Sequence, residues 1–166
     1  MMQNLLADTN IYGEMVIDID IEKLKQALSK NQDLIIFGSP IVRKELRSTP
    51  KKIKIGGSNL RIDLLSLYDL ITKERNLEIT SETEEMANYY FSAYLNFGGS
   101  QSMDEMIHDF LIVASASLKN MDIVVSNDES TLKSDHSLKA YALVNSIKKL
   151  RNPKFINYQQ FKELLR

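Results

Sequence analysis

Short apolar runs alternate along this chain with longer stretches of helical periodicity. The runs lie at Leu5–Ala7, 34–37, 77–79, 122–128 and 154–158. Between and after them the apolar spacing predicts helices at 20–30, from Pro40, 60–74, 80–96, 103–120, 134–150 and 159–166. Such alternation indicates a mostly parallel sheet covered by helices on both faces. We therefore expect an α/β fold with a mostly parallel, five-stranded sheet.

The composition is that of one domain, which we expect to span residues 1–166. Apolar residues make up 43% of the chain, enough for a single core. The absence of cysteine excludes disulfides and thiol catalysis, and two distant histidines, His108 and His136, do not supply a structural zinc site. The net charge of −1 indicates no particular partner.

The N-terminal stretch does not have the pattern of a signal peptide. The start lacks a basic region, and its first apolar run is too short for a signal peptide. No run approaches the ~20 apolar residues that a membrane span requires. We expect a soluble cytoplasmic protein that does not bind membranes.

Carboxylates stand at or just after several predicted strand ends. Asp8 ends the first run and Asp128 the fourth, while Glu45 lies on the helix after the second. Asp109 stands near the start of an apolar helix. If strands one, two and four are neighbours, all four acids meet at the carboxyl edge of the sheet, where open α/β sheets bind ligands.

Each of these acids also has a simpler interpretation. Asp8 and Asp128 could begin turns, and Glu129 rivals Asp128 as the functional acid. Glu45 could be a solvated helix charge, and Asp109 an acid favoured by the helix dipole.

Four carboxylates at one edge would repel one another, and a divalent cation would relieve that repulsion. Oxygen donors without Cys or His suit Mg²⁺ or Mn²⁺. Such an ion lowers the pKa of bound water and clamps a phosphodiester for in-line attack. The chain contains no GxGxxG, GxxxxGK[ST] or GxSxG motif, so the common dinucleotide, P-loop and hydrolase signatures are absent.

Four segments, "LLADTN", "PIVRKEL", "DFLIVASA" and "VVSND", together resemble the motifs of the PIN-domain nucleases. The resemblance implies a three-layer α/β/α fold and a divalent-metal ribonuclease. It assigns Asp8, Glu45, Asp109 and Asp128 as catalytic and metal-binding acids, with Asn10 and Ser126 supporting them. It also implies a homodimer and, as in VapBC-type toxins, inhibition by a small antitoxin protein.

Other functions remain open at this stage. Residues 50–100 carry no PIN signature, so a role in RNA processing outside a toxin–antitoxin pair is an alternative. A catalytically idle PIN-like module that binds RNA or protein is another. A haloacid-dehalogenase-like phosphatase would need an acid where Asn10 stands, and a small-molecule-binding Rossmann-like domain would need a phosphate loop.

The charge is unevenly distributed along the chain. Residues 43–61 carry seven bases and one acid, whereas residues 82–109 carry six acids and no Lys or Arg. A basic segment that contains Glu45 suggests polyanion binding beside a cation site, although two unrelated solvated surfaces would give the same counts. The predicted RNA-binding residues are Arg43, Lys44, Lys51, Lys52 and Lys54.

Overall fold

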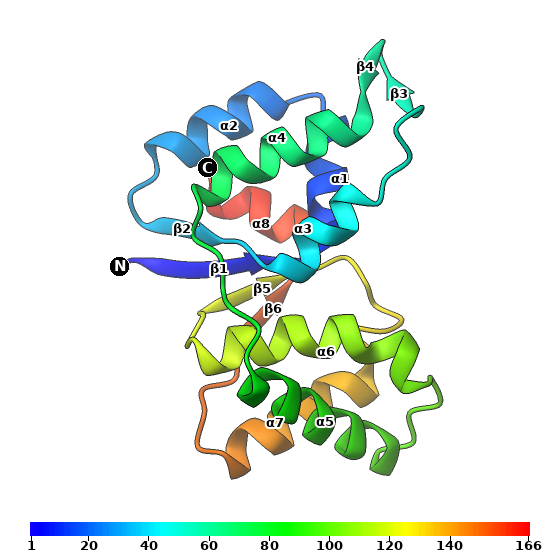
Figure 1. Cartoon of the computed structure of the whole chain (residues 1–166). Coiled ribbons are helices and arrows are strands. Elements are labelled where there is room, and N and C mark those ends of the chain that lie inside the picture. The colour runs from blue at the N-terminus through cyan, green and yellow to red at the C-terminus, as the bar shows by residue number, and fades with distance from the viewer.

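A four-stranded parallel sheet separates two layers of helices (Figure 1). The computed structural model describes residues 1–166. The strands are β1 (Gln3–Ala7), β2 (Leu34–Phe37), β5 (Ile123–Val125) and β6 (Lys154–Ile156), in the order β2-β1-β5-β6. β1 and β5 are neighbours although more than a hundred residues separate them, so the sheet joins distant parts of the chain.

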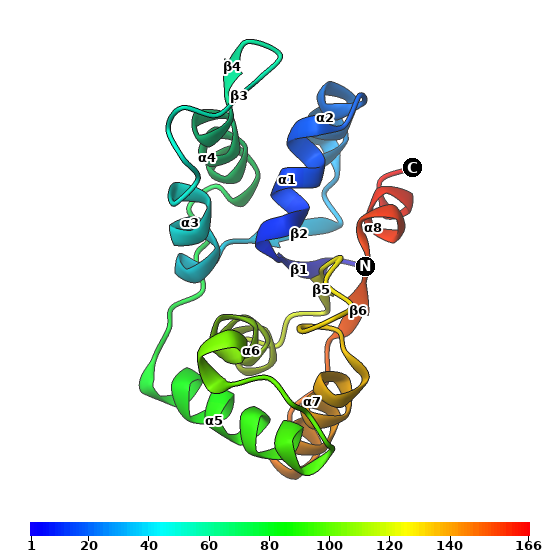
Figure 2. The same ribbon diagram turned by 90° about the vertical axis from the view of Figure 1, so that its right-hand side faces the viewer.

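The helices divide between the two faces of this sheet, as the perpendicular view shows (Figure 2). One layer contains α1 (Thr9–Ile17), α2 (Ile21–Lys30), α3 (Pro40–Arg47), α4 (Leu60–Thr72) and α8 (Tyr158–Leu164). The other contains α5 (Ser81–Asn96), α6 (Met103–Leu118) and α7 (Asp135–Ile147). One cluster of buried apolar side chains continues through both layers. The three-layer α/β/α architecture expected from the sequence is confirmed.

Local sequence signals account for several of the helix boundaries. The Ser39 hydroxyl accepts the Ile41 N–H at 3.2 Å, and Pro40 occupies the first helical position of α3. Thr80 caps α5, with Thr83 completing a capping box. From Phe110 to Leu118, α6 contains only apolar and small residues, and the helix packs against β5 and α5.

The expected strand at 77–79 does not form, so the sheet has four strands rather than five. Beyond α4 the chain crosses the outer edge of β2 and pairs only through a bridge between Gly38 and Asn76. A Cβ on Gly38 would collide with the Tyr68 hydroxyl and the Asn76 amide, so the close crossing requires glycine. The segment then leaves towards α5 on the opposite face.

Two elements were not expected from the sequence. The first is α1, which begins immediately after Asp8 and has no clear apolar stripe. The second is a short hairpin of β3 (Lys54–Ile55) and β4 (Ser58–Asn59), whose turn uses Gly56 and Gly57 at φ of 57° and 81°. No helix combines the length and apolar character that crossing a membrane requires.

Candidate active site

The carboxyl ends of β2, β1 and β5 lie side by side, because these three parallel strands are neighbours in the sheet. The adjacency on which the sequence argument depended is therefore confirmed. Asp8 follows β1 directly, and Ser126 follows β5. Glu45 lies on α3 after β2, and Asp109 lies in the second turn of α6. These strand ends and helices form the carboxylate rim, defined as Asp8, Glu45, Asp109 and Asp128.

Asp8 is the most buried acid of the rim, with 5% of its surface exposed. One carboxylate oxygen accepts the Thr9 N–H at 2.7 Å, so Asp8 also caps α1. The other oxygen accepts the Ser126 hydroxyl at 2.8 Å and the Asn10 amide at 3.3 Å. Burial raises the pKa of Asp8, the bonds from Ser126 and Thr9 counteract this, and the charges of Glu45 and Asp128 raise it further.

Ser126 connects two acids of the rim. Its hydroxyl donates to Asp8 and accepts the backbone N–H of Asp128 at 3.0 Å. Ser126 is fully buried, and its own N–H continues the sheet ladder by bonding the Ile156 carbonyl. Ser126 therefore holds Asp8 and Asp128 in a fixed relation to the sheet.

Asp128 is held by the loop that follows it. Its carboxylate accepts the Ser130 N–H and hydroxyl, each at 3.0 Å, and the Thr131 N–H at 2.9 Å, and it also accepts the Thr131 hydroxyl. Burial raises the pKa of Asp128, but these bonds outweigh it and lower the pKa on balance. Its rival Glu129 is largely exposed and pairs with Lys133 at 2.9 Å.

Glu45 is bound from two neighbouring elements. The Thr9 hydroxyl of α1 donates to one carboxylate oxygen at 2.5 Å. His108 of α6 contacts the other oxygen through Nδ1 at 3.1 Å. These contacts tie α3 to α1 and to α6, and they direct the Glu45 side chain towards the rim.

Asp109 has the most perturbed carboxyl group of the rim. Burial raises its pKa to about 7, a hydrogen bond with Thr131 counteracts this, and the charges of Asp8, Asp128 and Glu45 raise it further. The Thr131 hydroxyl has a single proton and donates it to Asp128, so it cannot donate to Asp109 at the same time. The rim therefore carries more negative charge than its hydrogen bonds neutralise.

The four acids sense one another's charge, yet no three of them converge closely enough to hold a metal ion. Three of them, Asp8, Glu45 and Asp128, instead accept hydrogen bonds from hydroxyl, amide or imidazole groups. The side chains of the rim suit a hard divalent cation, because such ions prefer carboxylate oxygens as ligands. Binding such an ion at this rim would require some of these hydrogen bonds to be replaced.

Sequence reasoning missed two polar groups at the rim, Thr9 and Thr131. It interpreted His108 as structural or exposed, and that side chain also contacts the rim. Thr9 and His108 are direct neighbours of Asp8 and Asp109 along the chain, and Thr131 lies three residues after Asp128. Their closeness in sequence to Asp8, Asp109 and Asp128 could have marked them as rim residues. It could not have shown that Thr9 and His108 contact Glu45, because Glu45 lies on a different helix.

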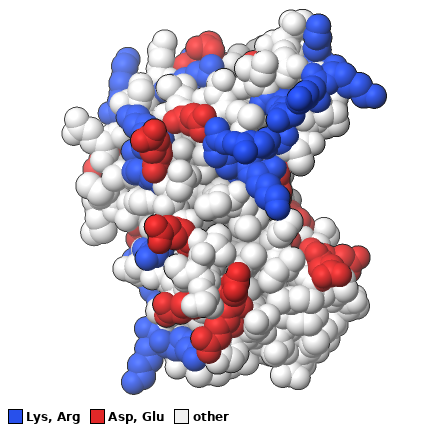
Figure 3. All heavy atoms as spheres, viewed as in Figure 1, with Lys and Arg blue, Asp and Glu red and all other residues white.

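The basic segment lies over α3 and the β3–β4 hairpin, where Figure 3 shows Lys and Arg gathered on one face. Lys44, Lys51, Lys52 and Lys54 are exposed. Arg43 instead forms a two-pronged ion pair with Asp69 of α4, with both nitrogen–oxygen distances at 3.1 Å. Because Lys44 adjoins Glu45, the basic surface reaches the rim from the α3 side.

Several solved structures share this fold at low sequence identity. A chain of VapBC2 from Rickettsia felis, bound to a DNA fragment from the promoter, is 15% identical with a TM-score of 0.57, covering 93% of this chain and 98% of that chain. A chain of FitAcB from Neisseria gonorrhoeae is 14% identical with a TM-score of 0.54, covering 93% and 98%. A chain of DNA-bound VapBC from Salmonella typhimurium is 14% identical with a TM-score of 0.55, covering 95% and 99%.

This chain has a PIN-like, VapC-like fold. The fold expected from the four sequence segments is thereby confirmed. No protein-family model matches the sequence, and no curated protein matches it. The likeness rests on three-dimensional structure over nearly the whole chain, and it concerns the fold.

Proposed function

We propose that this chain is a divalent-metal-dependent endoribonuclease that hydrolyses RNA phosphodiesters at Asp8, Glu45, Asp109 and Asp128. The observation that carries the proposal is the placement of four acids at one edge of the sheet, where burial and the other three acids raise the pKa of Asp109 to about 7. A fold gains nothing from holding four mutually repelling carboxylates together unless a cation or a proton neutralises them. The PIN-like fold supports the same assignment.

Mg²⁺ or Mn²⁺ would be held by Asp8, Asp109, Asp128 and Glu45. When bound, the ion supplies an activated water and neutralises charge on the phosphate. The residues of this chain do the positioning. Ser126 and Asn10 orient Asp8 from one side, and the Thr9 N–H orients it from the other. Thr9 and His108 hold Glu45 on α3, and Thr131 holds Asp128 beside Asp109.

We further propose that the chain acts as the toxin of a toxin–antitoxin pair and functions as a homodimer. The fold neighbours include VapBC and FitAB, which were solved on DNA. By analogy, the partner of this chain is a small antitoxin protein, and its substrate is RNA.

Incubation of the pure protein with mixed RNAs tests the enzymatic proposal. We expect endonucleolytic cleavage with Mg²⁺ or Mn²⁺ and none with EDTA. Binding of RNA without cleavage under every metal condition would instead make the chain a catalytically idle binding module. Cleavage that persists in EDTA would remove the metal from the mechanism.

Ser126→Ala should weaken metal binding and cleavage by about 10–100-fold, the usual cost of losing a group that orients a ligand. The substitution removes the donor to Asp8 and the acceptor for the Asp128 N–H, while both acids remain. Mn²⁺ titration followed by thermal stability, together with cleavage rates, measures the effect. Ser66→Ala is the matched control, because Ser66 is exposed on α4. Equal Mn²⁺ affinity in both variants would contradict the assigned role.

Replacing Lys51, Lys52 and Lys54 by Gln should weaken RNA binding and reduce its dependence on salt. If all three contact phosphates of single-stranded RNA, the slope of log K against log salt falls in magnitude by about 2. The control replaces three exposed lysines away from the hairpin, Lys30, Lys119 and Lys139. A salt slope equal to that of the native protein would remove the hairpin lysines from the RNA path.

A further inference from the structure

The outer edge of β2 is only half covered. β2 is the edge strand of the sheet, and the Gln3 N–H bonds the Asp33 carbonyl at 2.7 Å. Backbone groups alternate in direction along a strand, so positions 33, 35 and 37 face β1. Positions 34, 36 and 38 therefore face away from the sheet.

At the carboxyl end, the crossing segment after α4 bonds this outer edge. The Gly38 N–H donates to the Arg75 carbonyl at 2.6 Å, and the Leu77 N–H donates to the Gly38 carbonyl at 2.8 Å. The Arg75 guanidinium donates to the Ile36 carbonyl at 3.2 Å. Three outward groups remain without a protein partner: the Leu34 N–H, the Leu34 carbonyl and the Ile36 N–H. Unpaired edge groups are a template for another extended chain. Leu34 and Ile36 themselves are buried, so access to these groups is through the cavity that both residues line.

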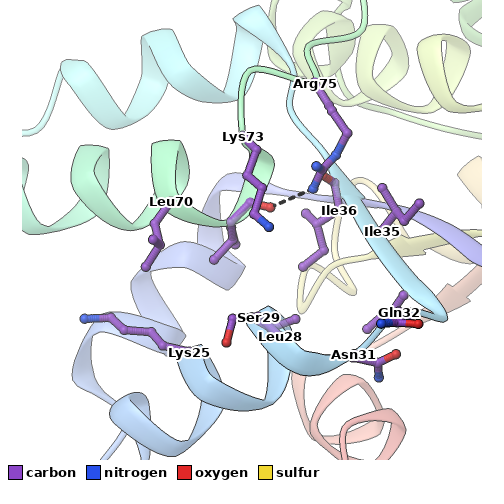
Figure 4. A pocket seen from close by; sticks show the side chains of 12 residues that line it. Lys25, Leu28, Ser29, Asn31, Gln32, Ile35, Ile36, Leu70, Lys73 and Arg75 are labelled. Atoms are coloured by element: carbon purple, nitrogen blue, oxygen red, sulfur yellow. Dashed lines mark hydrogen bonds between the residues drawn. The ribbon is translucent and has the colours of Figure 1, made fainter.

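A cavity of about 300 Å³ lies beside these free groups, between α2, β2 and the end of α4 (Figure 4). We call it the β2-edge groove. Its apolar lining includes Leu28, Leu34, Ile36, Leu70 and Ile71. Figure 4 shows the side chains of Ile36 and Leu70 on opposite sides of it.

The charged residues of the β2-edge groove are all cationic: Lys25, Lys73 and Arg75. Arg75 is occupied by the carbonyls of Ile36 and Ile71, and Lys25 pairs with Glu22 outside the lining at 3.1 Å. Lys73 has no ion pair. No carboxylate lines the groove, so its charge is complementary to an acidic ligand.

We propose that the β2-edge groove binds an extended acidic segment of a partner protein, which adds to the sheet as a strand beside β2. The free backbone groups of Leu34 and Ile36 supply main-chain hydrogen bonds, and the apolar lining receives alternate side chains. The cations pair with acids on the segment. The groove lies at the amino end of β2, whereas the carboxylate rim lies beyond its carboxyl end, so this binding is independent of the proposed nuclease chemistry.

A fluorescein-labelled peptide of eight alternating Val and Glu residues is the probe, followed by fluorescence anisotropy with the full chain. We expect saturable binding that weakens at least about tenfold when alternate peptide nitrogens are methylated, because methylation removes strand hydrogen bonds. The same peptide with Lys in place of Glu should not bind. Absence of saturable Val–Glu binding, or equal binding of the methylated peptide, overturns the proposal.

Two variants connect the binding to the groove. Lys25→Glu combined with Lys73→Glu should weaken Val–Glu binding about tenfold, whereas Lys30→Glu combined with Lys119→Glu, at exposed lysines outside the groove, should not. Amide exchange supplies a readout without substitution, because the Leu34 and Ile36 N–H groups should be protected when the peptide binds. If the groove variants instead alter RNA binding or self-association while peptide binding is unchanged, the proposed occupant is wrong.

Discussion

We expect Asp8→Asn to abolish RNA cleavage in Mg²⁺ or Mn²⁺ and to leave the metal-free fold at least as stable as the native protein. Asparagine caps a helix as well as aspartate does, so the contact with the Thr9 N–H survives. The substitution removes the negative charge, which lies in a buried position where burial and two other acids raise its pKa. A neutral amide is also a poorer ligand for a hard cation than a carboxylate.

Thermal melts in EDTA and in Mn²⁺ separate the two parts of this expectation. At a Mn²⁺ concentration of about a hundred times its Kd, binding adds about 2.7 kcal/mol to the stability of the native protein, and much less to the variant. Asp104→Asn, at an exposed acid of α6, is the control and should retain both cleavage and the metal response. Strong destabilisation of Asp8→Asn in EDTA would make Asp8 a structural residue.

Without metal, Asp109→Asn should be more stable than the native protein at pH 8, and this advantage should shrink as the pH falls. The pKa of Asp109 is about 7 in the folded chain, against an ordinary value of 3.8. Between these values the folded state binds more protons than the unfolded state, so the free energy of unfolding falls as pH rises and levels off above pH ~7. Above pH ~7, the ionised Asp109 carboxylate lowers the free energy of unfolding by an amount on the order of 4 kcal/mol.

Urea unfolding in EDTA at pH 5 and pH 8 measures this effect. The advantage of Asp109→Asn should decrease by about 2–3 kcal/mol between pH 8 and pH 5. Comparing the two proteins cancels contributions that they share, including Asp18, whose pKa is lowered to about 2 by Lys162 and Tyr158. Asp104→Asn should follow the native curve. If the Asp109→Asn and native curves remain parallel, Asp109 is already ionised below neutral pH.

The elements best predicted from the sequence are those in which the local turn or capping residues and the apolar pattern indicate the same boundaries. The run at 34–37 forms β2 with the expected boundaries, and the Ser39–Pro40 pair begins α3 as predicted. Tyr90, Tyr94 and Phe97 recur at helical spacing, which favours core or dimer packing over base stacking, but Phe97 is exposed. Tyr90 and Tyr94 are buried in α5, where their rings pack against Phe110.

The errors arise where tertiary contacts override the local pattern. The residues at 77–79 resemble a strand, but the chain only crosses the edge of β2 and pairs with it at Gly38. In α1, Gly13 and a nearly continuous apolar run conceal the helical period, so the helix was missed. The four acids were found because each adjoins a recognisable element. Their contacts with hydroxyl and imidazole groups were missed because those contacts depend on how separate elements meet.

The pairing of β1 with β5 determines when the carboxylate rim can form during synthesis of the chain. Asp8 and the serine that holds it are 118 positions apart, and Asp128 lies beyond both. A ribosome therefore completes α1 to α6 before it releases the segment that closes the rim. Because non-local pairing of this kind forms slowly, a nascent chain lacks the full set of acids until β5 inserts beside β1. Under the proposed function, the nascent chain would acquire its four acids as one site only after β5 has left the ribosome.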